Sequence, residues 1–310
     1  MRFRVSEQTG QSTIGPGCFD RAPGLCQRRR SPVRLQFRIS EPGGGMPASG
    51  GFTEDRRYVA ALARGLDVLQ AFRYGERWLT HQEITRRTGL PKATVSRIAF
   101  TLVSLGYLRQ DGAKGSYGLG NGGLTLGFRV LVNAEIAAIA RPELEELAQL
   151  SQAAVSLGVR HQLSMVYIAH ARGQARLTLS LDVGARIPIE STSMGRAFLC
   201  ALPAHRRAEL DRQLQDKLGA DWGPRAAALD RAAQQWRDTG FVTSEAEWES
   251  DINAVGASID PGHGAEPYAI NVGGPTNVLT RERMYEELGP RVAQAARRIE
   301  QGLRFQAAQA

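Results

Sequence analysis

Apolar residues recur along the chain, from position 58 onward, at the spacing of an amphipathic helix. Intervals of three and four residues place them on one side of a helix and leave polar side chains on the other. We therefore predict a first helix whose apolar side faces a core. The positions concerned are Val59, Leu62, Leu66, Leu69 and Phe72.

Two further helices are expected next, separated by a glycine turn. Thr80 and Glu83 match the S/T-x-x-E capping box, in which each side chain accepts a hydrogen bond from an unpaired backbone N–H, so a short helix should begin at His81. Gly89 interrupts this helix, and Pro91 opens the next one at a position where its missing N–H costs nothing. The predicted inward stripe of the third helix is Val95, Ile98, Ala99, Leu102 and Leu105.

A hairpin follows the third helix. Residues 107–110 and 116–119 have the character of two short strands around a loop that contains glycine. Three helices and a hairpin, with a glycine turn between the second and third helices, form a winged helix-turn-helix.

The remainder of the chain mixes helices and strands without strict alternation, which indicates an α+β domain. Between residues 124 and 151 the pattern is helical, and Pro142 is expected to separate two helices, because proline disfavours helical geometry in the residue before it. Strands are predicted at residues 154–159, 164–169, 175–181, 254–259 and 268–272, and helices at 193–201, 204–218, 226–238 and 281–303.

Positive charge is concentrated towards the amino terminus. Residues 1–45 hold eight arginines against three acidic residues, and residues 46–120 hold eleven Lys or Arg against six acidic residues. The other 190 residues carry 20 basic and 22 acidic groups. This division predicts a polyanion-binding module attached to a body that binds neither nucleic acid nor an acidic surface.

Length and composition narrow the class of protein further. The 310 residues exceed the ~250 to 300 that one hydrophobic core usually serves, so two domains are expected. A content of 42% hydrophobic and 23% charged residues excludes wholesale disorder. No apolar run approaches the roughly 18 residues that cross a bilayer, so we expect a cytoplasmic protein without membrane contact. Cys18, Cys26 and Cys200 are expected to be free thiols, and no Cys/His cluster indicates a metal site.

The first 55 residues show no apolar period and contain the flexible run Gly43-Gly44-Gly45. Such a segment buries too little apolar surface to offset the entropy of ordering, so we expect a disordered basic tail. Two other interpretations stay open: translation begins at Met46, or the segment is a basic arm that follows a nucleic-acid backbone. We favour a tail or a mis-assigned start over an arm.

The third predicted helix carries the side chains that a DNA-reading helix needs. A major groove about 12 Å wide admits one helix, and bases are read by short polar side chains and by Arg or Lys near its amino end. Arg86 and Arg87 on the preceding helix are expected to contact phosphates, and Lys114 at the wing tip to reach phosphate or the minor groove. The candidates on the third helix are Lys92, Thr94, Ser96 and Arg97.

With these residues the chain resembles the IclR-type transcriptional regulators. The similarity extends over about residues 57–305, and its helix-turn-helix portion is the most specific. The resemblance implies a GAF-like effector domain, in which a curved antiparallel sheet is flanked by helices and a pocket binds a small organic molecule, often a carboxylate or aromatic acid. The matching segments are 63–69, 79–84, 88–97, 105–108, 117–120, 126–127, 193–197 and 270–276.

The amino end of the helix predicted from residue 193 is a candidate anion site. Backbone N–H groups, a serine hydroxyl and Arg196 converge there. Ser258 and Asn271, on the two late strands, are candidate polar groups of the effector pocket, and Glu245 and Trp248 are candidate parts of its lid. The predicted effector-binding residues are Ser193, Met194, Gly195, Arg196, Glu245, Trp248, Ser258 and Asn271.

Two other classes of protein compete with a DNA-binding regulator. Residues 118–123 match G-x-G-x-x-G, but a dinucleotide site needs a β-α-β unit and an acidic residue at a strand end, so we interpret this segment as a turn between wing and linker. Residues 256–260 fail G-x-S-x-G, and the five histidines lack H-E-x-x-H spacing, so we expect no enzyme and no cofactor. A ligand-sensing protein that acts through protein contacts, without DNA binding, is the other alternative.

We therefore predict a homodimeric or tetrameric transcriptional regulator that binds a double-stranded DNA operator under the control of a small-molecule effector. Its predicted parts are the tail at 1–55, the winged helix-turn-helix at 56–120, a linker or dimerisation helix at 121–139, and the effector-binding domain at 140–310.

Overall fold

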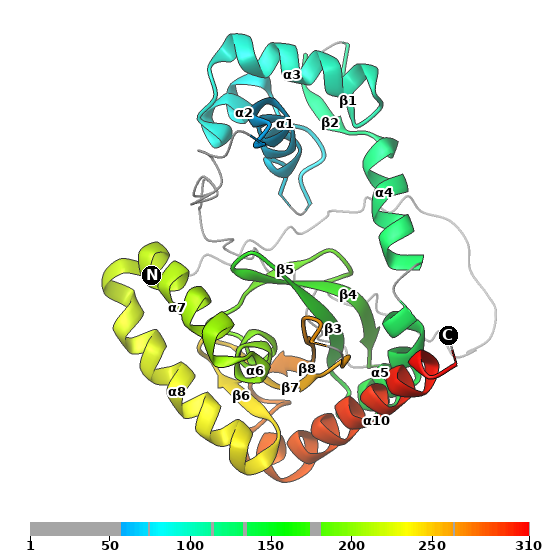
Figure 1. Cartoon of the computed structure of the whole chain (residues 1–310), viewed down its shortest axis with the longest axis vertical. Helices are drawn as coiled ribbons and strands as arrows, with labels where there is room; N and C mark the ends of the chain where they lie inside the picture. Colours follow the sequence, from blue (N-terminus) through cyan, green and yellow to red (C-terminus); the bar gives the residue numbers. More distant parts are fainter. Residues whose placement is uncertain are drawn as a thin grey trace, which may run out of the picture. The chain divides into compact units, whose positions relative to one another are not determined.

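The computed structural model describes residues 57–73, 75–112, 115–132, 135–173, 181–262 and 264–309. These residues form two regions with separate hydrophobic cores (Figure 1). The tail expected at 1–55 lies outside them. In the described part of the chain, no helix combines the length and the apolar character needed to cross a membrane.

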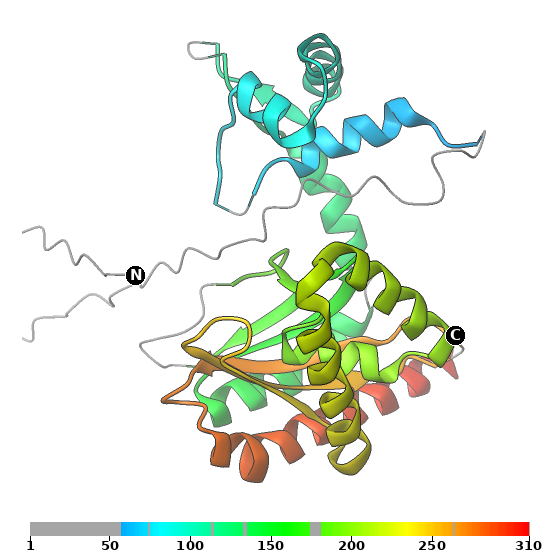
Figure 2. The ribbon, with the colours of Figure 1, turned by 90° about the vertical axis from the view of Figure 1, so that its left-hand side faces the viewer.

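The first region is a winged helix-turn-helix. Its helices α1 (Ala60–Gln70), α2 (His81–Thr88) and α3 (Lys92–Ser104) precede the antiparallel strands β1 (Leu108–Gln110) and β2 (Tyr117–Leu119) (Figure 2). The predicted fold of this region is confirmed. The buried apolar side chains of its core are Val68, Leu79, Ile84, Val95, Ala99 and Leu108.

The turn between α2 and α3 follows the predicted chemistry. The Glu83 N–H donates to Thr80 Oγ1 at 3.2 Å, and the Thr80 N–H donates to Glu83 Oε2 at 2.7 Å. Both partners of the capping box are therefore in place. Gly89 ends α2 with φ of 68°, a backbone conformation that a residue without Cβ adopts at little cost. Pro91 then precedes α3 as its N-cap.

The apolar stripe predicted for the first helix was wrong in part: Leu69 and Phe72 pack against the core, but three other residues do not. Val59, Leu62 and Leu66 are 62%, 64% and 48% exposed, and α1 buries Val68 instead. Leu105, predicted to lie on the inward side of α3, is also 63% exposed. Spacing identified the apolar side of α1, but only the packing of the three helices decides which part of that side the small core covers.

The glycines after the wing are required by close packing. A Cβ on Gly118 would lie 2.9 Å from the carbonyl oxygen of Arg77, and one on Gly120 would lie 2.2 Å from that of Gly106. Because β1 and β2 are antiparallel and lead directly into α4 (Asn121–Val132), this G-x-G-x-x-G match belongs to no β-α-β unit. The segment does connect wing and linker, but only Gly120 lies between β2 and α4, so most of the predicted turn belongs to these two elements.

Pro142 does not separate two helices, contrary to the prediction. It lies inside α5 (Glu135–Ser151). Ile136 and Ala140 before it, and Leu144 after it, are buried in the same core. Burial of this continuous apolar face offsets the backbone hydrogen bond that proline removes.

The second region is built on a curved, six-stranded antiparallel sheet. Its strands lie in the order β5-β4-β3-β8-β7-β6, so strands from both ends of the region meet at its centre. Their bounds are β3 (Ala154–His161), β4 (Ser164–Arg172), β5 (Arg186–Pro188), β6 (Val242–Glu245), β7 (Ile252–Ile259) and β8 (Tyr268–Pro275). The expectation of an α+β domain with a curved antiparallel sheet is confirmed.

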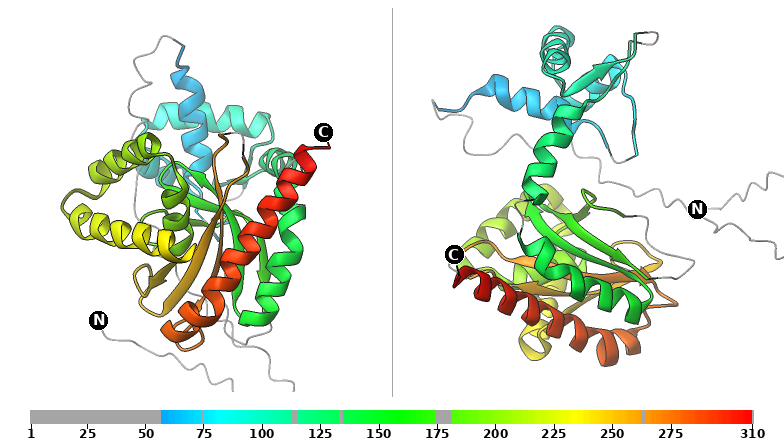
Figure 3. Two further views of the ribbon diagram at one scale, coloured as in Figure 1. Left: turned by 60° about the horizontal axis from the view of Figure 1, so that its bottom comes forward. Right: turned by 90° about the vertical axis from the view of Figure 1, so that its right-hand side faces the viewer.

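Helices cover both faces of this sheet. On one face lie α5 and α10 (Gly289–Ala307), side by side (Figure 3). On the other lies α6 (Ser193–Ala201), backed by α7 (Ala204–Leu218) and α8 (Trp222–Thr239). Side chains alternate along β8: Ile270 and Val272 pack on the α5/α10 side, while Ala269 packs on the α6 side. The polar residue between Ile270 and Val272 therefore faces α6.

Two short strands were not predicted, and one predicted strand lies largely outside the described residues. β5 and β6 hold only three and four residues, too few for an apolar period to appear. Residues 175–180 of the strand expected at 175–181 are among those that the structure does not describe. The last predicted helix is divided into α9 (Arg281–Arg283), a π-helical turn (Met284–Leu288) and α10.

Candidate DNA-binding surface and effector pocket

The exposed side of α3 carries most of the predicted base-reading residues. Lys92, Ser96 and Arg97 are exposed, whereas Thr94 is half-buried. Ser96 Oγ lies 3.0 Å from Nε2 of His81, so this serine also joins α3 to α2. Lys92 and Arg97 have no ion-pair or hydrogen-bond partner among the described residues, which leaves their charges available to a ligand.

The two arginines of α2 occupy different environments. Arg86 is exposed, as a phosphate contact requires. Arg87 is held by both carboxylate oxygens of Glu76 and also donates to the carbonyl oxygen of Ala71 at 2.8 Å. This guanidinium holds the pKa of Glu76 below its usual value. We therefore reassign Arg87 from phosphate contact to the packing of α2 against the α1–α2 connection.

The wing carries a basic residue that sequence reasoning missed. Arg109 on β1 is exposed, and its guanidinium carbon lies 4.8 Å from the ring centroid of Trp78, a cation-π contact. The alternation of buried Leu108 with exposed Arg109 along β1 could have identified it. Lys114, the predicted wing-tip contact, lies outside the described residues.

A pocket in the second region lies between the sheet and the amino end of α6. It is narrow, with a volume of about 10 Å³. None of the side chains that line it is charged, and two of them, Tyr167 and Trp248, are aromatic. The lining residues are Tyr167, Ile187, Thr192, Ser244, Trp248, Ile252, Ala254, Asn271 and Gly273.

The amino end of α6 offers hydrogen-bond donors beside this pocket. Thr192 caps the helix: its Oγ1 accepts from the Gly195 N–H at 3.2 Å and donates to the carbonyl oxygen of Pro188 at 2.6 Å. The backbone N–H groups of Ser193 and Met194, in the first turn, have no partner within the helix. They are the kind of donors that bind a carboxylate.

In addition to Glu190 Oε2, two buried polar side-chain atoms on α6 and β8 have no hydrogen-bond partner among the described residues. They are Ser193 Oγ, in a fully buried residue, and Oδ1 of Asn271, which lines the pocket. A buried polar atom without a hydrogen bond costs about 1 to 3 kcal/mol. A ligand that hydrogen-bonds to them would recover that free energy.

Two of the lining residues, Tyr167 and Asn271, belong to a neutral polar cluster on β3, β4 and β8. Asn271 is opposite Ser156 in the sheet, and Ser156 Oγ lies 2.9 Å from Nδ1 of His170. Burial raises the pKa of Tyr167 to about 12, although hydrogen bonding with Asn271 and Ser156 acts against it. Burial, together with the charge of Arg172, lowers the pKa of His170 to about 4. Both side chains are therefore neutral near pH 7.

The predicted anion ligand Arg196 has protein partners instead. It is buried, and its two terminal nitrogens donate to the two carboxylate oxygens of Glu247, each at 2.6 Å. It also donates to the carbonyl oxygen of Thr243 at 3.1 Å. A guanidinium with this many partners joins α6 to the loop after β6, and we reassign it to that structural role.

The other predicted effector residues divide into two groups. Asn271 and Trp248 line the pocket, whereas Ser258 and Glu245 do not. Glu245 is paired with Arg281 at 2.8 Å. Met194 packs beneath the sheet, with Sδ 2.3 Å from the place of a Cβ on Gly158, and a Cβ on Gly195 would lie 2.0 Å from the carbonyl oxygen of Ile189.

Most pocket residues carried no signal in the sequence. Tyr167 and Ala254 lie on strands that look apolar, and Ser244 lies on the unpredicted strand β6. Thr192 could have been found, because a Thr directly before a helix is a preferred N-cap. No group of His, Cys, Asp and Glu side chains able to hold a metal ion occurs within the described ranges.

Comparison with known proteins accounts for both regions. Residues 61–112 match the IclR helix-turn-helix domain, and residues 128–301 match the bacterial transcriptional regulator IclR C-terminal family. The chain is similar to the HTH-type transcriptional regulator TsaQ1/TsaQ2 of Comamonas testosteroni, at 33% identity over 248 residues that cover 79% of this chain and 89% of the relative.

Solved structures show the same arrangement. An IclR family transcriptional regulator from Brucella abortus is 38% identical, with a TM-score of 0.74, over 82% of this chain and 96% of that one. An IclR homologue from Microbacterium hydrocarbonoxydans, complexed with 4-hydroxybenzoate, shares the fold at 22% identity and a TM-score of 0.61, over 79% and 99% of the two chains. Since family, relatives and fold agree along most of its length, the chain belongs to the IclR family of bacterial transcriptional regulators.

Proposed function

We propose that this regulator reads its operator with α3 and that a small organic acid controls the reading from the pocket at the amino end of α6. One observation supports the reading of DNA by α3. Lys92 and Arg97 are exposed and have no ion-pair partner among the described residues, and the other side of this helix packs in the core. Arg97 would contact base edges, while Arg86, Arg109 and Lys114 would contact the phosphate backbone.

The lining of the α6 pocket favours an aromatic acid that also carries a hydroxyl group. Tyr167 and Trp248 supply apolar ring surfaces, and the free N–H groups of the first α6 turn supply donors for a carboxylate. The unpaired acceptor Oδ1 of Asn271 would take a hydroxyl donor. The homologue from Microbacterium, which shares the fold, was solved with a ligand of this class.

Entry of an aromatic ring requires the pocket to widen, because its present volume holds about one water molecule. Trp248 is half-buried and lies in the loop between β6 and β7, so it is the side chain we expect to move. Through the Arg196–Glu247 pair, that loop is attached to α6. Effector binding would thus shift both elements together and alter the placement of the DNA-reading heads.

We propose a homodimer or tetramer, in which the exposed stripe of α1 contributes to self-association. Val59, Leu62 and Leu66 lie on one side of α1 and are exposed in the single chain. Leu124 and Leu126 of α4 are exposed as well, which fits the expected linker or dimerisation helix at 121–139. Contiguous patches of exposed apolar side chains often mark surfaces where protein chains associate.

We propose that the effector is bound and not chemically changed. A Ser–His pair, Ser156 and His170, lies next to the pocket residue Asn271 in the sheet, but the group that contacts the other ring nitrogen of His170 does not suit a hydrolase. Arg172 Nε donates to His170 Nε2 at 3.0 Å, so a cation stands where catalytic triads place a carboxylate. A histidine with a pKa of about 4 is a weak base for the proton of a serine hydroxyl.

The proposed DNA binding is tested by titrating the protein into a labelled duplex from the region upstream of the regulator's own gene and measuring fluorescence anisotropy. We expect affinity to fall as salt rises, with a slope set by the phosphates neutralised, and to fall for Arg97→Ala. Arg212→Ala, an exposed arginine of α7, is the matched control. Absence of binding at low salt would favour a ligand sensor that acts through protein contacts.

Ligand binding is tested separately by thermal shift with benzoate and 4-hydroxybenzoate. We expect 4-hydroxybenzoate to raise the melting temperature more than benzoate, and Asn271→Leu to remove the difference, because that variant lacks the acceptor Oδ1. Equal shifts for both acids in the wild-type protein would contradict the assignment of Asn271.

A further inference from the structure

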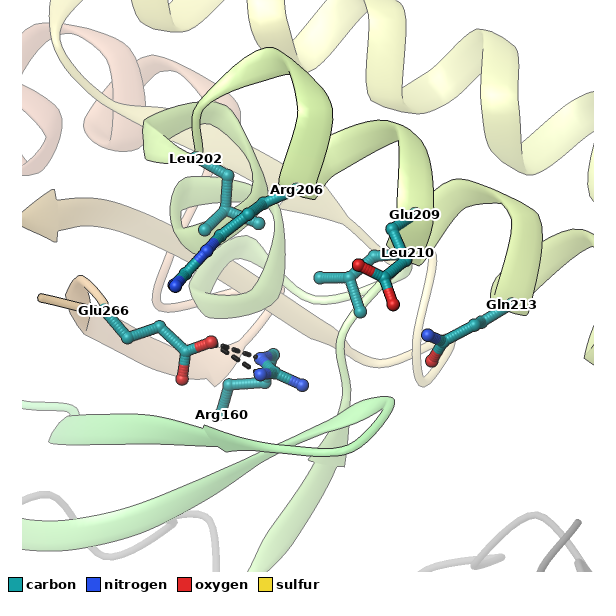
Figure 4. Close-up of a pocket in the computed structure, with 7 residues that line it drawn as sticks. All are labelled: Arg160, Leu202, Arg206, Glu209, Leu210, Gln213 and Glu266. Carbon is teal, nitrogen blue, oxygen red and sulfur yellow. Dashed lines mark hydrogen bonds and ion pairs between the residues drawn. The ribbon is translucent and has the colours of Figure 1, made fainter. Parts of the chain in front are cut away.

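A second cavity lies at the carboxyl end of α6, where Leu202 ends the helix. It has a volume of about 360 Å³, which is within the range of small-molecule pockets, and it shares no lining residue with the α6 pocket (Figure 4). Its lining residues come from four segments: Arg160 at the end of β3, Leu202 at the carboxyl end of α6, one side of α7, and Glu266 before β8. Sequence reasoning assigned no role to any of these residues.

One wall is a fixed ion pair. Arg160 Nε donates to Glu266 Oε1 at 2.9 Å, and Nη2 donates to the same oxygen at 2.5 Å. Arg160 Nη1 also donates to the carbonyl oxygen of Gln162 at 3.2 Å. These contacts hold the guanidinium and the carboxylate in place, so this wall is preorganised.

The facing wall, on α7, carries two opposite charges that have no partner. Arg206 and Glu209 are exposed, and neither has an ion pair or hydrogen bond with any described residue. They are three positions apart and thus lie on the same side of the helix. Figure 4 shows their side chains leaving α7 in different directions above the Arg160–Glu266 pair. Between the two walls, the buried side chains of Leu202 and Leu210 form an apolar floor.

We propose that this cavity binds a small zwitterion of the α-amino acid class with an apolar side chain. Arg206 would hold the carboxylate in a bidentate contact, Glu209 would accept from the ammonium group, and the side chain would lie on Leu202 and Leu210. Two guanidinium groups and two carboxylates around one cavity balance in charge, which disfavours both a simple anion and a polyanion. The regulator would then sense two chemically different molecules.

Isothermal titration of the full-length protein with L-leucine, L-methionine and L-phenylalanine tests this proposal. We expect at least one of the three to bind, and its affinity to fall about tenfold or more in Arg206→Gln and in Glu209→Gln, since each variant loses a charged contact with the ligand. The blocked forms of the same amino acid, its amide and its N-acetyl derivative, should lose affinity by a similar factor.

Exposed residues of the same helix supply matched controls. Arg212→Gln and Asp216→Asn remove the same charges without touching the cavity and should bind as the wild type does. Asn271→Leu, in the α6 pocket, should also leave amino acid binding unchanged, and an unchanged thermal unfolding transition in each variant shows that the second region is folded.

No binding by any of the three amino acids at about 10 mM, the weak end of specific affinity, overturns the proposal. So does equal affinity for the N-acetyl derivative, which would indicate a simple anion site, and so does loss of binding in Asn271→Leu alone, which would place the ligand in the α6 pocket.

Discussion

Arg196, which is 3% exposed, donates to both carboxylate oxygens of Glu247 at 2.6 Å, so a buried cation on α6 is neutralised by the loop that carries Trp248. The Arg196 guanidinium holds the pKa of Glu247 below its usual value. The residue that looked most like an effector ligand in the sequence is instead the attachment between the pocket's helix and its proposed lid.

Removing the acidic partner should destabilise the second region. In Glu247→Gln the charge of Arg196 stays buried without a compensating carboxylate. The free energy of unfolding should fall by about 3 kcal/mol, which is near the lower end for broken buried ion pairs because Glu247 is partly exposed. Urea unfolding at pH 7 measures the loss. Glu249→Gln in the same loop is the control, because burial and Asp251 raise the pKa of Glu249 and its charge contributes no favourable pairing.

The effect of Glu247 should depend on pH in a defined direction. A carboxylate whose folded pKa lies below its ordinary value of 4.5 contributes stability that is present above that value and disappears as pH falls through the folded pKa. The difference between wild type and Glu247→Gln should therefore shrink below about pH 4.5. A difference that stays constant down to pH 3 would contradict the ion-pair explanation.

His170 should make the protein less stable in mild acid. Its folded pKa of about 4 lies below the ordinary value of 6.5, so the unfolded chain binds a proton that the folded chain does not. Its contribution is complete above pH 6.5 and decreases between pH 6.5 and about 4, by at most about 3 kcal/mol. Melting temperatures of wild type and His170→Gln at pH 7.5 and 5 check this, and the variant should lose less on acidification. His205→Gln, an exposed histidine of α7, should behave as the wild type.

Three arginines of the winged helix-turn-helix should give three different results. Arg97→Ala should weaken operator binding and reduce the preference for the operator over random duplex. Arg86→Ala should weaken both equally and lower the salt slope by about one. Arg87→Ala should leave the salt slope unchanged and lower the stability of this region by about 1 to 3 kcal/mol, because Glu76 loses its partner. Equal effects of all three on operator and random DNA would argue against this division.

Gly195 should tolerate no side chain. A Cβ there would lie 2.0 Å from the carbonyl oxygen of Ile189, and two backbones in contact have little room to separate. Gly195→Ala should therefore lower the free energy of unfolding by about 1 to 3 kcal/mol or more. Gly184→Ala is the control for backbone strain. A Cβ on Gly184 would have no neighbour within 4 Å, but the positive φ of 90° at this position is unfavourable for alanine. A smaller loss for Gly195→Ala than for Gly184→Ala would contradict the packing argument.

Local signals determined the winged helix-turn-helix and most of the helices of the second region. The capping box at Thr80 and Glu83, the left-handed Gly89 and the bounds of α6 and α7 depend on neighbours within a few positions, and those are visible in the amino-acid order. The exposed charges of α3 follow from the same periodicity that places Val95 and Ala99 in the core.

Tertiary structure alone decided which polar side chains meet. Asn271 and Ser156 are more than a hundred positions apart and become neighbours because β3 pairs with β8, and Arg160 reaches Glu266 for the same reason. Arg87 and Arg196 form ion pairs with residues of other segments, Glu76 and Glu247, and the sequence around each arginine does not show these partners. A pocket is a property of packed elements, and periodicity along one element carries no information about the distance to another.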